Sequence, residues 1–172
     1  MNFEIAELDR KLNNLLRIGT IKVADHERQQ IKVESGGLTT GWLDWPAEIG
    51  RNYRRWRPLR VGTQVLIACP SGDPAQALVI GMLYTQAIDT PSENPEIDLI
   101  EFNGGSYLKH NATDNSIHIH AAAEMTLSYS HLYMQGPVTQ TGGDMTSDGI
   151  SAQHHTHGGV QAGGSNTAEP NA

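Results

Sequence analysis

Residues 64–84 read Gln-Val-Leu-Ile-Ala-Cys-Pro-Ser-Gly-Asp-Pro-Ala-Gln-Ala-Leu-Val-Ile-Gly-Met-Leu-Tyr. Two short apolar runs, 64–69 and 76–84, flank a stretch of turn-forming residues, 71–74. Runs of this length, bounded by glycine and proline, predict two buried strands joined by a turn. Cys69 ends the first run, and we expect it to be a small buried apolar residue rather than a nucleophile.

The segment before these strands predicts a hairpin over residues 18–34. Ile21 and Val23 alternate with polar residues, and so do Ile31 and Val33, while residues 25–29 form a polar turn. Several short strands without intervening helices indicate a small barrel, and the OB-fold is the commonest five-stranded barrel. We therefore expect a mainly β protein whose residues 18–88 form an OB-fold domain.

A helix is predicted over residues 1–17, with its regular part at 2–17 and Asn2 as its N-cap. Ile5, Leu8, Leu12 and Leu15 follow the a/d spacing of a coiled coil. Two heptads are too short for a stable isolated coiled coil. The apolar side of this helix therefore packs either on its own domain or on another chain.

The only strongly basic run, residues 51–60, carries five arginines interleaved with Tyr53 and Trp56. Such a mixture can bind nucleic acid through stacking and phosphate contacts, which gives one alternative function, an OB-fold nucleic-acid-binding protein. The other alternative is docking to an acidic protein partner, through Arg54, Arg55 and Arg57. A net charge of −7 for the whole chain favours protein docking over nucleic acid.

Composition excludes several classes of protein. The chain has 172 residues, enough for one ordinary domain or two small ones, and a single cysteine, so no intrachain disulfide can form. No apolar run reaches the length of a membrane span, and the N-terminus does not resemble a signal peptide. Motifs for a phosphate loop, a serine hydrolase or a zinc protease are absent from the sequence, so we expect no enzyme and no small-molecule substrate.

The chain changes character after residues 85–96, a stretch with two prolines whose second part, 89–96, we assign as the linker. Residues 97–150 alternate short apolar and polar rows between glycine-containing breaks, as in 117–120, 125–129 and 132–134. Ile117 and Ile119 are expected on the inner face of one such strand, with His118 and His120 on the solvent side. The segment has too few apolar residues for a core of its own and requires partner chains.

Residues 153–159, Gln-His-His-Thr-His-Gly-Gly, follow this segment. His155 and His157 would point the same way in an extended strand, and three chains would supply six imidazoles, an octahedral set that suits iron or nickel better than zinc. The alternative is a solvated polar cluster, and the extra His154 leaves open which pair would bind. Residues 161–172 contain no side chain that could drive folding.

The turn and strand at 70–84 resemble those of the baseplate assembly protein V family, the central spikes of contractile phage tails and R-type pyocins. The resemblance rests on Pro70-Ser71-Gly72-Asp73, on residues 75–81, and on Leu83-Tyr84. It extends through the order of segments to Asp148-Gly149-Ile150-Ser151 and the His-x-His that follows. Some relatives carry a lysozyme domain, for which this chain is too short.

The resemblance implies a homotrimer in which residues 97–150 form an intertwined trimeric β-helix needle. Its tip, within 151–172, would hold one iron ion, best assigned as Fe²⁺, through His155 and His157 of each chain. The spike would be assembled in the host cytoplasm into a virion or tailocin baseplate and would contact tail hub proteins. On sheath contraction it would puncture the outer membrane of the target cell by mechanical force, without catalysis.

Overall fold

The computed structural model of the chain describes residues 3–159 and 163. The predicted N-cap, Asn2, and the predicted polar tail apart from Gly163 lie outside the described residues. The described residues up to Met125 form one compact unit, and those from Thr126 onward form another.

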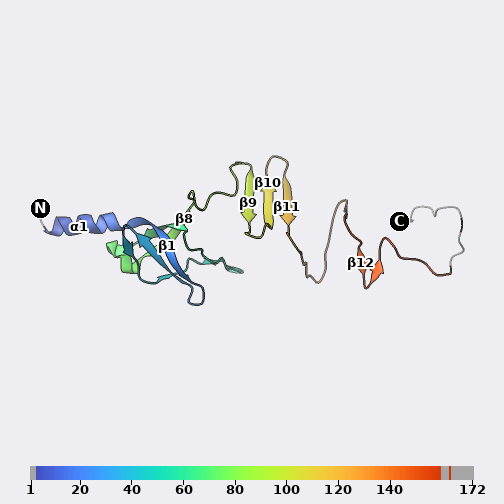
Figure 1. Cartoon of the computed structure of the whole chain (residues 1–172), viewed down its shortest axis with the longest axis horizontal. Helices are drawn as coiled ribbons and strands as arrows, with labels where there is room; N and C mark the ends of the chain where they lie inside the picture. Colours follow the sequence, from blue (N-terminus) through green and yellow to red (C-terminus); the bar gives the residue numbers. More distant parts are fainter. Residues whose placement is uncertain (1–2, 160–162, 164–172) are drawn as a thin grey trace. The chain divides into compact units, whose positions relative to one another are not determined.

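The elements follow one another along the chain as in Figure 1. They are α1 (Phe3–Asn14), β1 (Leu16–Asp25), β2 (Gln30–Ser35), β3 (Leu38–Thr39), β4 (Leu43–Asp44), β5 (Glu48–Ile49), β6 (Arg54–Arg55), β7 (Gln64–Ala68), the short 3-10 turns η1 (Pro70–Gly72) and η2 (Pro74–Gln76), β8 (Leu78–Leu83), β9 (Ile97–Glu101), β10 (Tyr107–Asn111), β11 (Ser116–His120), β12 (Thr146–Ser147) and β13 (Ile150–Ser151). The described chain is thus mainly β, with one α-helix, as the sequence predicted.

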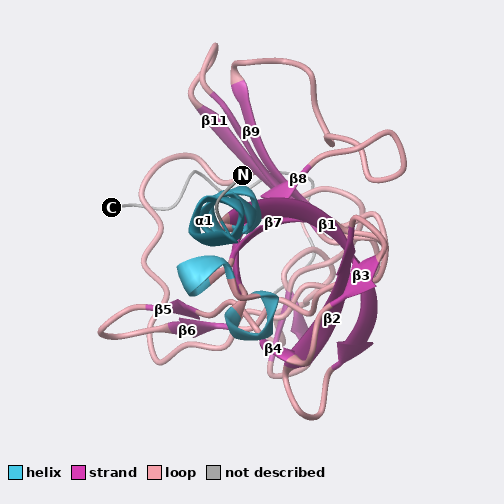
Figure 2. Ribbon diagram, turned by 90° about the vertical axis from the view of Figure 1, so that its left-hand side faces the viewer, coloured by secondary structure: helices cyan, strands magenta, loops and turns pink. Residues whose placement is uncertain are grey.

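The main sheet has the strand order β3-β2-β1-β7-β8, and β4 adds a further pairing to β2. Neighbouring strands are antiparallel throughout. Figure 2 shows β1, β2, β7 and β8 curving around a common interior. The hairpin predicted at 18–34 and the strand pair predicted at 64–84 are therefore confirmed, and together they form most of this small barrel.

Alternation along the strands places the core inside the barrel. Ile31 and Val33 from β2 are buried, as are Val65 and Ile67 from β7. Cys69 is also buried, and this burial raises the pKa of its thiol. Among the described residues, every buried apolar side chain lies between Ile21 and Ala77. The prediction of Cys69 as a core residue is confirmed.

The alternation expected for β1 is interrupted. Ile21 is buried, but Val23 is exposed, although both were predicted on one side of the strand. The register of β1 against β2 shifts between these two residues. Such a bulge inserts one extra residue into a strand and so turns the following side chains to the other face.

The N-terminal helix is shorter than predicted. It ends at Asn14, because Leu16 and Arg17 pair with Ala68 and Ile67 of β7, and residues committed to a strand cannot continue a helix. No residue of α1 is buried. The apolar row Ile5, Leu8, Leu12 is exposed, so the first of the two alternatives, packing on its own domain, is not what the single chain forms.

Strands β9, β10 and β11 form a separate three-stranded antiparallel sheet. Residues directly opposite one another share a face, so Ile100, Leu108 and Ile119 form one row, and Ile117 lies in the next row of the same face. His118 and His120 lie on the opposite face, as the alternation predicted. In the single chain both faces are exposed at β11.

Residues 121–145 form no strand, although 125–129 and 132–134 were predicted to be strand-like. Their apolar side chains are exposed, among them Leu127, Tyr129, Tyr133 and Met134. A strand needs a neighbour to pair its N–H and C=O groups, and this segment pairs with no strand of the described chain. The trimeric β-helix stays a prediction.

Candidate metal centre and docking surface

The histidine cluster follows the short hairpin of β12 and β13. Asp148 and Gly149 form its turn, both with positive φ. β13 ends at Ser151, and the chain turns over residues 152–154. This turn is held against the preceding segment, because the Ala152 N–H donates to the Met145 carbonyl and the Gln153 N–H to the Asp144 carboxylate. His155 and His157 therefore come after a turn and not within a strand.

The two imidazoles are nevertheless neighbours. The ring centroids of His155 and His157 are 5.0 Å apart, with an angle of 81° between the ring planes. Nδ1 of His155 lies 2.9 Å from the carbonyl oxygen of Ser151. A carbonyl can only accept, so Nδ1 carries the proton and Nε2 keeps its lone pair free for a ligand bond. The Ser151 hydroxyl accepts from the His154 N–H, at 2.6 Å.

The two imidazoles of one chain supply at most half of the ligands that a metal site needs. Within the described chain, no group of three or more histidine, cysteine or acidic side chains gathers in one place. Two imidazoles of one chain, one of them with its tautomer set by a backbone carbonyl, are the donor type that suits first-row transition metals. A complete site on these residues would need ligands beyond the two imidazoles.

The predicted docking arginines lie on and beside the hairpin of β5 and β6. Register places Glu48 opposite Arg55, and Ile49 opposite Arg54. Glu48 Oε2 lies 3.1 Å from Arg55 Nη1, and Glu48 Oε1 lies 3.1 Å from Arg57 Nη2. One carboxylate thus bridges two of the three predicted arginines, while Arg54 points from the other face of the hairpin.

Aromatic rings anchor this hairpin to the barrel. The rings of Trp45 and Trp56 are stacked, with centroids 5.2 Å apart, and the other neighbour of Trp45 is His26, at 5.3 Å. The Trp45 indole N–H donates to the Arg57 carbonyl. An open groove of about 460 Å³ runs between the tryptophans and the arginines of the hairpin. It presents aromatic surface beside positive charge.

Sequence reasoning identified the histidines and arginines but missed Glu48 and Ser151. The signal for Glu48 was the presence of a single acidic residue just before a basic run. The signal for Ser151 was a hydroxyl residue at the end of a strand, where it can cap the following turn. The roles of both residues could be recognised only once the register of the hairpins was known.

No helix among residues 3–159 and 163 is long and apolar enough to cross a membrane.

Comparison with known proteins bears on both regions. A family model described as the type VI secretion system and phage-baseplate injector OB domain matches residues 17–84, which confirms the predicted OB-fold barrel. A second, described as the GpV apex motif, matches residues 149–171, which include His155 and His157. The spike protein of Escherichia phage P2 is 25% identical over 199 residues, covering 92% of this chain and 94% of that protein. With matches at both ends of the chain and a relative along nearly all of it, the chain is similar to the phage baseplate spike family.

Proposed function

We propose that the chain is the homotrimeric central spike of a contractile injection apparatus, and that it punctures the outer membrane of the target cell when the sheath contracts. The role is mechanical, with no catalytic step and no small-molecule substrate. Assembly into the baseplate takes place in the host cytoplasm. The observation that carries the proposal is the His155–His157 pair, which lies within the apex-motif match and supplies too few ligands for a metal by itself.

Exposed apolar rows support the trimer. Ile100 and Leu108 are each 41% exposed, and Ile117 and Ile119 are 68% and 65% exposed, all on one face of the β9–β11 sheet. Covering these four side chains would contribute roughly 3–6 kcal/mol per chain, taking about 1.5–3 kcal/mol for complete burial of each. Two further copies around a three-fold axis would cover this face in every chain and would give 121–145 the strand neighbours it lacks.

The tip would be closed by one iron ion, Fe²⁺ being the best assignment, held by His155 and His157 of each of the three chains. The free Nε2 of His155 and the nearby ring of His157 support this assignment. When bound, the ion would cross-link three chain ends that have no core of their own. Fraying under load would then require the ligand bonds of all three chains to break.

Arg54, Arg55 and Arg57 would dock the spike to acidic surfaces of the tail hub or other baseplate proteins. The exposed hairpin and the aromatic groove beside it support a protein partner, since both present apolar and charged groups together.

Mass and metal content of the purified full chain test the proposal together. Native mass spectrometry should give three times the 18.7 kDa mass of one chain, with about one iron ion per trimer. A monomeric protein would contradict the spike assignment. A trimer without metal, or with three ions, would contradict the tip assignment and leave the spike assignment standing.

A further inference from the structure

The carboxylate of Glu48 is shared by two guanidinium groups. Each of its oxygens lies 3.1 Å from a nitrogen of a different arginine, Arg55 or Arg57. The three side chains are between about a third and a half exposed, so solvent screens these ion pairs partly but not completely. The trio carries a net charge of +1 instead of the +2 that the two arginines alone would present.

The remaining arginines of the basic run are differently placed. Arg54 lies across from Ile49 on the other face of the hairpin, and within residues 3–159 neither it nor Arg51 nor Arg60 forms an ion pair. Arg55 and Arg57 therefore share one carboxylate, whereas Arg54 has none, although all three arginines line the same groove.

Part of the aromatic surface on this hairpin is already occupied, although Trp56 remains 56% exposed. Binding of single-stranded nucleic acid requires a track of cations together with aromatic faces open to the bases. Trp56 uses one face of its ring against Trp45, and Trp45 is bracketed by Trp56 and His26. Tyr53 is exposed, but it stands outside the groove between the tryptophans and the arginines.

We infer that Glu48 is a specificity-determining residue, which disfavours nucleic-acid backbones at the basic hairpin by halving the net charge of the Arg55–Arg57 pair, while leaving Arg54 for an acidic protein partner. The inference deepens the proposed docking role and rests on it for the identity of the partner. The effect of Glu48 itself depends only on the two bridges. It explains how an OB barrel with five clustered arginines can avoid the polyanions that surround it during assembly.

The test compares Glu48→Gln with the wild type in the full-length protein. Fluorescence anisotropy with a labelled single-stranded DNA would be measured at low and moderate salt. Each neutralised phosphate adds about 0.7 to the slope of log K against log salt, so the one net positive charge that Glu48→Gln releases should steepen it by about 0.7. Between about 50 and about 200 mM salt, the loss of affinity should then be about 2.6-fold larger in the variant than in the wild type.

Matched variants separate neutralisation from changes in net charge or folding. Glu93→Gln removes the same negative charge at an exposed residue that forms no ion pair within the described residues, and it should leave the slope unchanged. In the wild-type background, Arg55→Gln should reduce residual DNA binding less than Arg54→Gln, because Glu48 partly compensates the charge of Arg55. These two variants keep the Glu48 carboxylate and test the inference even if Glu48→Gln loosens the hairpin.

Equal slopes for Glu48→Gln and Glu93→Gln would overturn the inference, as would an Arg55→Gln effect as large as that of Arg54→Gln. Either result would leave the spike assignment intact, because trimer mass and iron content test that separately. Conversely, if the protein is a monomer but Glu48→Gln still increases its affinity for DNA, the role inferred for Glu48 stands and the spike assignment is wrong.

Discussion

Gly72 lies against the backbone of Lys11 so closely that a Cβ atom at residue 72 would be 2.5 Å from the Lys11 carbonyl oxygen. Gly72 also has a φ of +70°, which favours glycine. The turn after β7 thus packs closely against the last turns of α1. The Cys69 N–H donates to the carbonyl of Leu15, the residue after the helix, and so fixes the point where the chain leaves α1 for the barrel.

We predict that Gly72→Ala displaces α1 from this turn. Left-handed backbone costs a non-glycine residue about 1–2 kcal/mol, and the clash with Lys11 adds to it. Gly37→Ala is the matched control, because Gly37 has a φ of +79° but open space around its Cβ position. Urea unfolding should show a larger loss for Gly72→Ala, with faster amide exchange in α1. Equal losses in the two variants would mean that the helix does not pack there.

The apolar face of the β9–β11 sheet should be essential for the trimer. Ile119→Glu would place three carboxylates in the interface, and light scattering should then show mainly single chains. His120→Glu, one residue further and on the opposite face, should remain trimeric. The reverse pattern would mean that the histidine face is the one that other chains cover.

Replacing both His155 and His157 with alanine should abolish iron binding, since the described residues contain no cluster of three or more histidine, cysteine or acidic side chains that could hold a metal ion instead. The trimer should persist, because the sheet faces above the tip hold it together. His154→Ala should keep the metal, since this residue contributes its backbone N–H to Ser151. Elemental analysis of the three proteins decides among them. Loss of iron from the His154 variant would mean that the predicted pair of ligands is wrong.

Arginine docking should depend most on Arg54. Arg54→Glu reverses the uncompensated cation of the hairpin and should block incorporation into particles, with the trimer unchanged. Arg55→Glu and Arg57→Glu should also impair assembly, partly by repelling Glu48 and so disturbing the hairpin. Complementation of a spike-deficient particle provides the measurement. Normal assembly of all three variants would remove any docking role from this surface.

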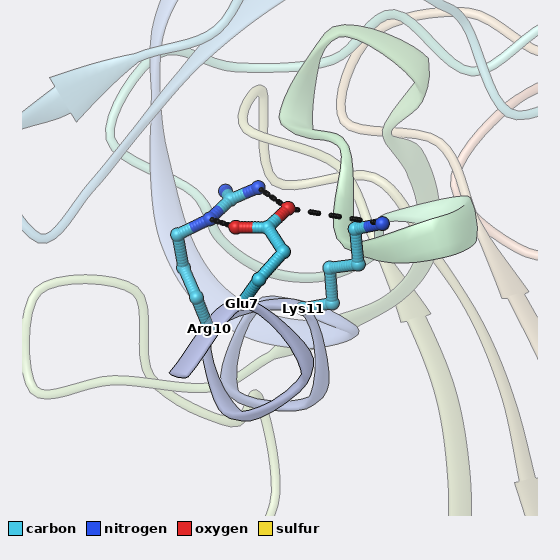
Figure 3. A network of polar contacts seen from close by, with 3 residues as sticks. All are labelled: Glu7, Arg10 and Lys11. Atoms are coloured by element: carbon cyan, nitrogen blue, oxygen red, sulfur yellow. Dashed lines mark hydrogen bonds and ion pairs between the residues drawn. The ribbon is translucent and has the colours of Figure 1, made fainter. Parts of the chain in front are cut away.

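Helix α1 should lose stability in acid. Figure 3 shows Glu7 accepting from Arg10, at 2.8 and 2.9 Å, with Lys11 Nζ 3.7 Å away. The hydrogen bond from Arg10 lowers the pKa of Glu7 below its ordinary value of 4.5. A lowered pKa in the folded state gives a stabilisation that is complete above the ordinary pKa and is lost as the pH falls through the folded-state value.

Amide exchange of α1 should therefore accelerate as the pH falls below about 4.5, after correction for the intrinsic rate. Glu7→Gln should remove this acid dependence at the cost of a constant, small loss of protection. High salt should reduce the difference, because the pair is exposed. An unchanged acid response in Glu7→Gln would assign it to other carboxylates.

The sequence predicted those elements whose apolar side chains a single chain can bury. The hairpin could be predicted because Ile31 and Val33 alternate with polar residues. The strands at 64–84 could be predicted because Val65 and Ile67 lie in a short apolar run. Val23 was misplaced because a bulge depends on the partner strand and leaves no mark in one strand alone. The helix was predicted too long because Leu15 continues the a/d spacing, whereas the next residue, Leu16, pairs with Ala68 in a strand.

The candidate sites divide in the same way. The spacing of His155 and His157 correctly brought their rings together, although a turn and not a strand does so. Glu48 escaped because its two bridges depend on the register of β5 against β6. Residues 121–145 pair with no strand of the described chain, so the strands predicted there stay a prediction.

The confinement of every described buried apolar side chain to the stretch from Ile21 to Ala77 has a consequence for engineering. Cutting or extending the chain beyond residue 96 removes no side chain from the barrel core. In the proposed spike, the length of the needle should therefore be adjustable while the same barrel is kept. A series of variants with needles of different length on the same barrel would then allow the reach of the apparatus to be chosen by design.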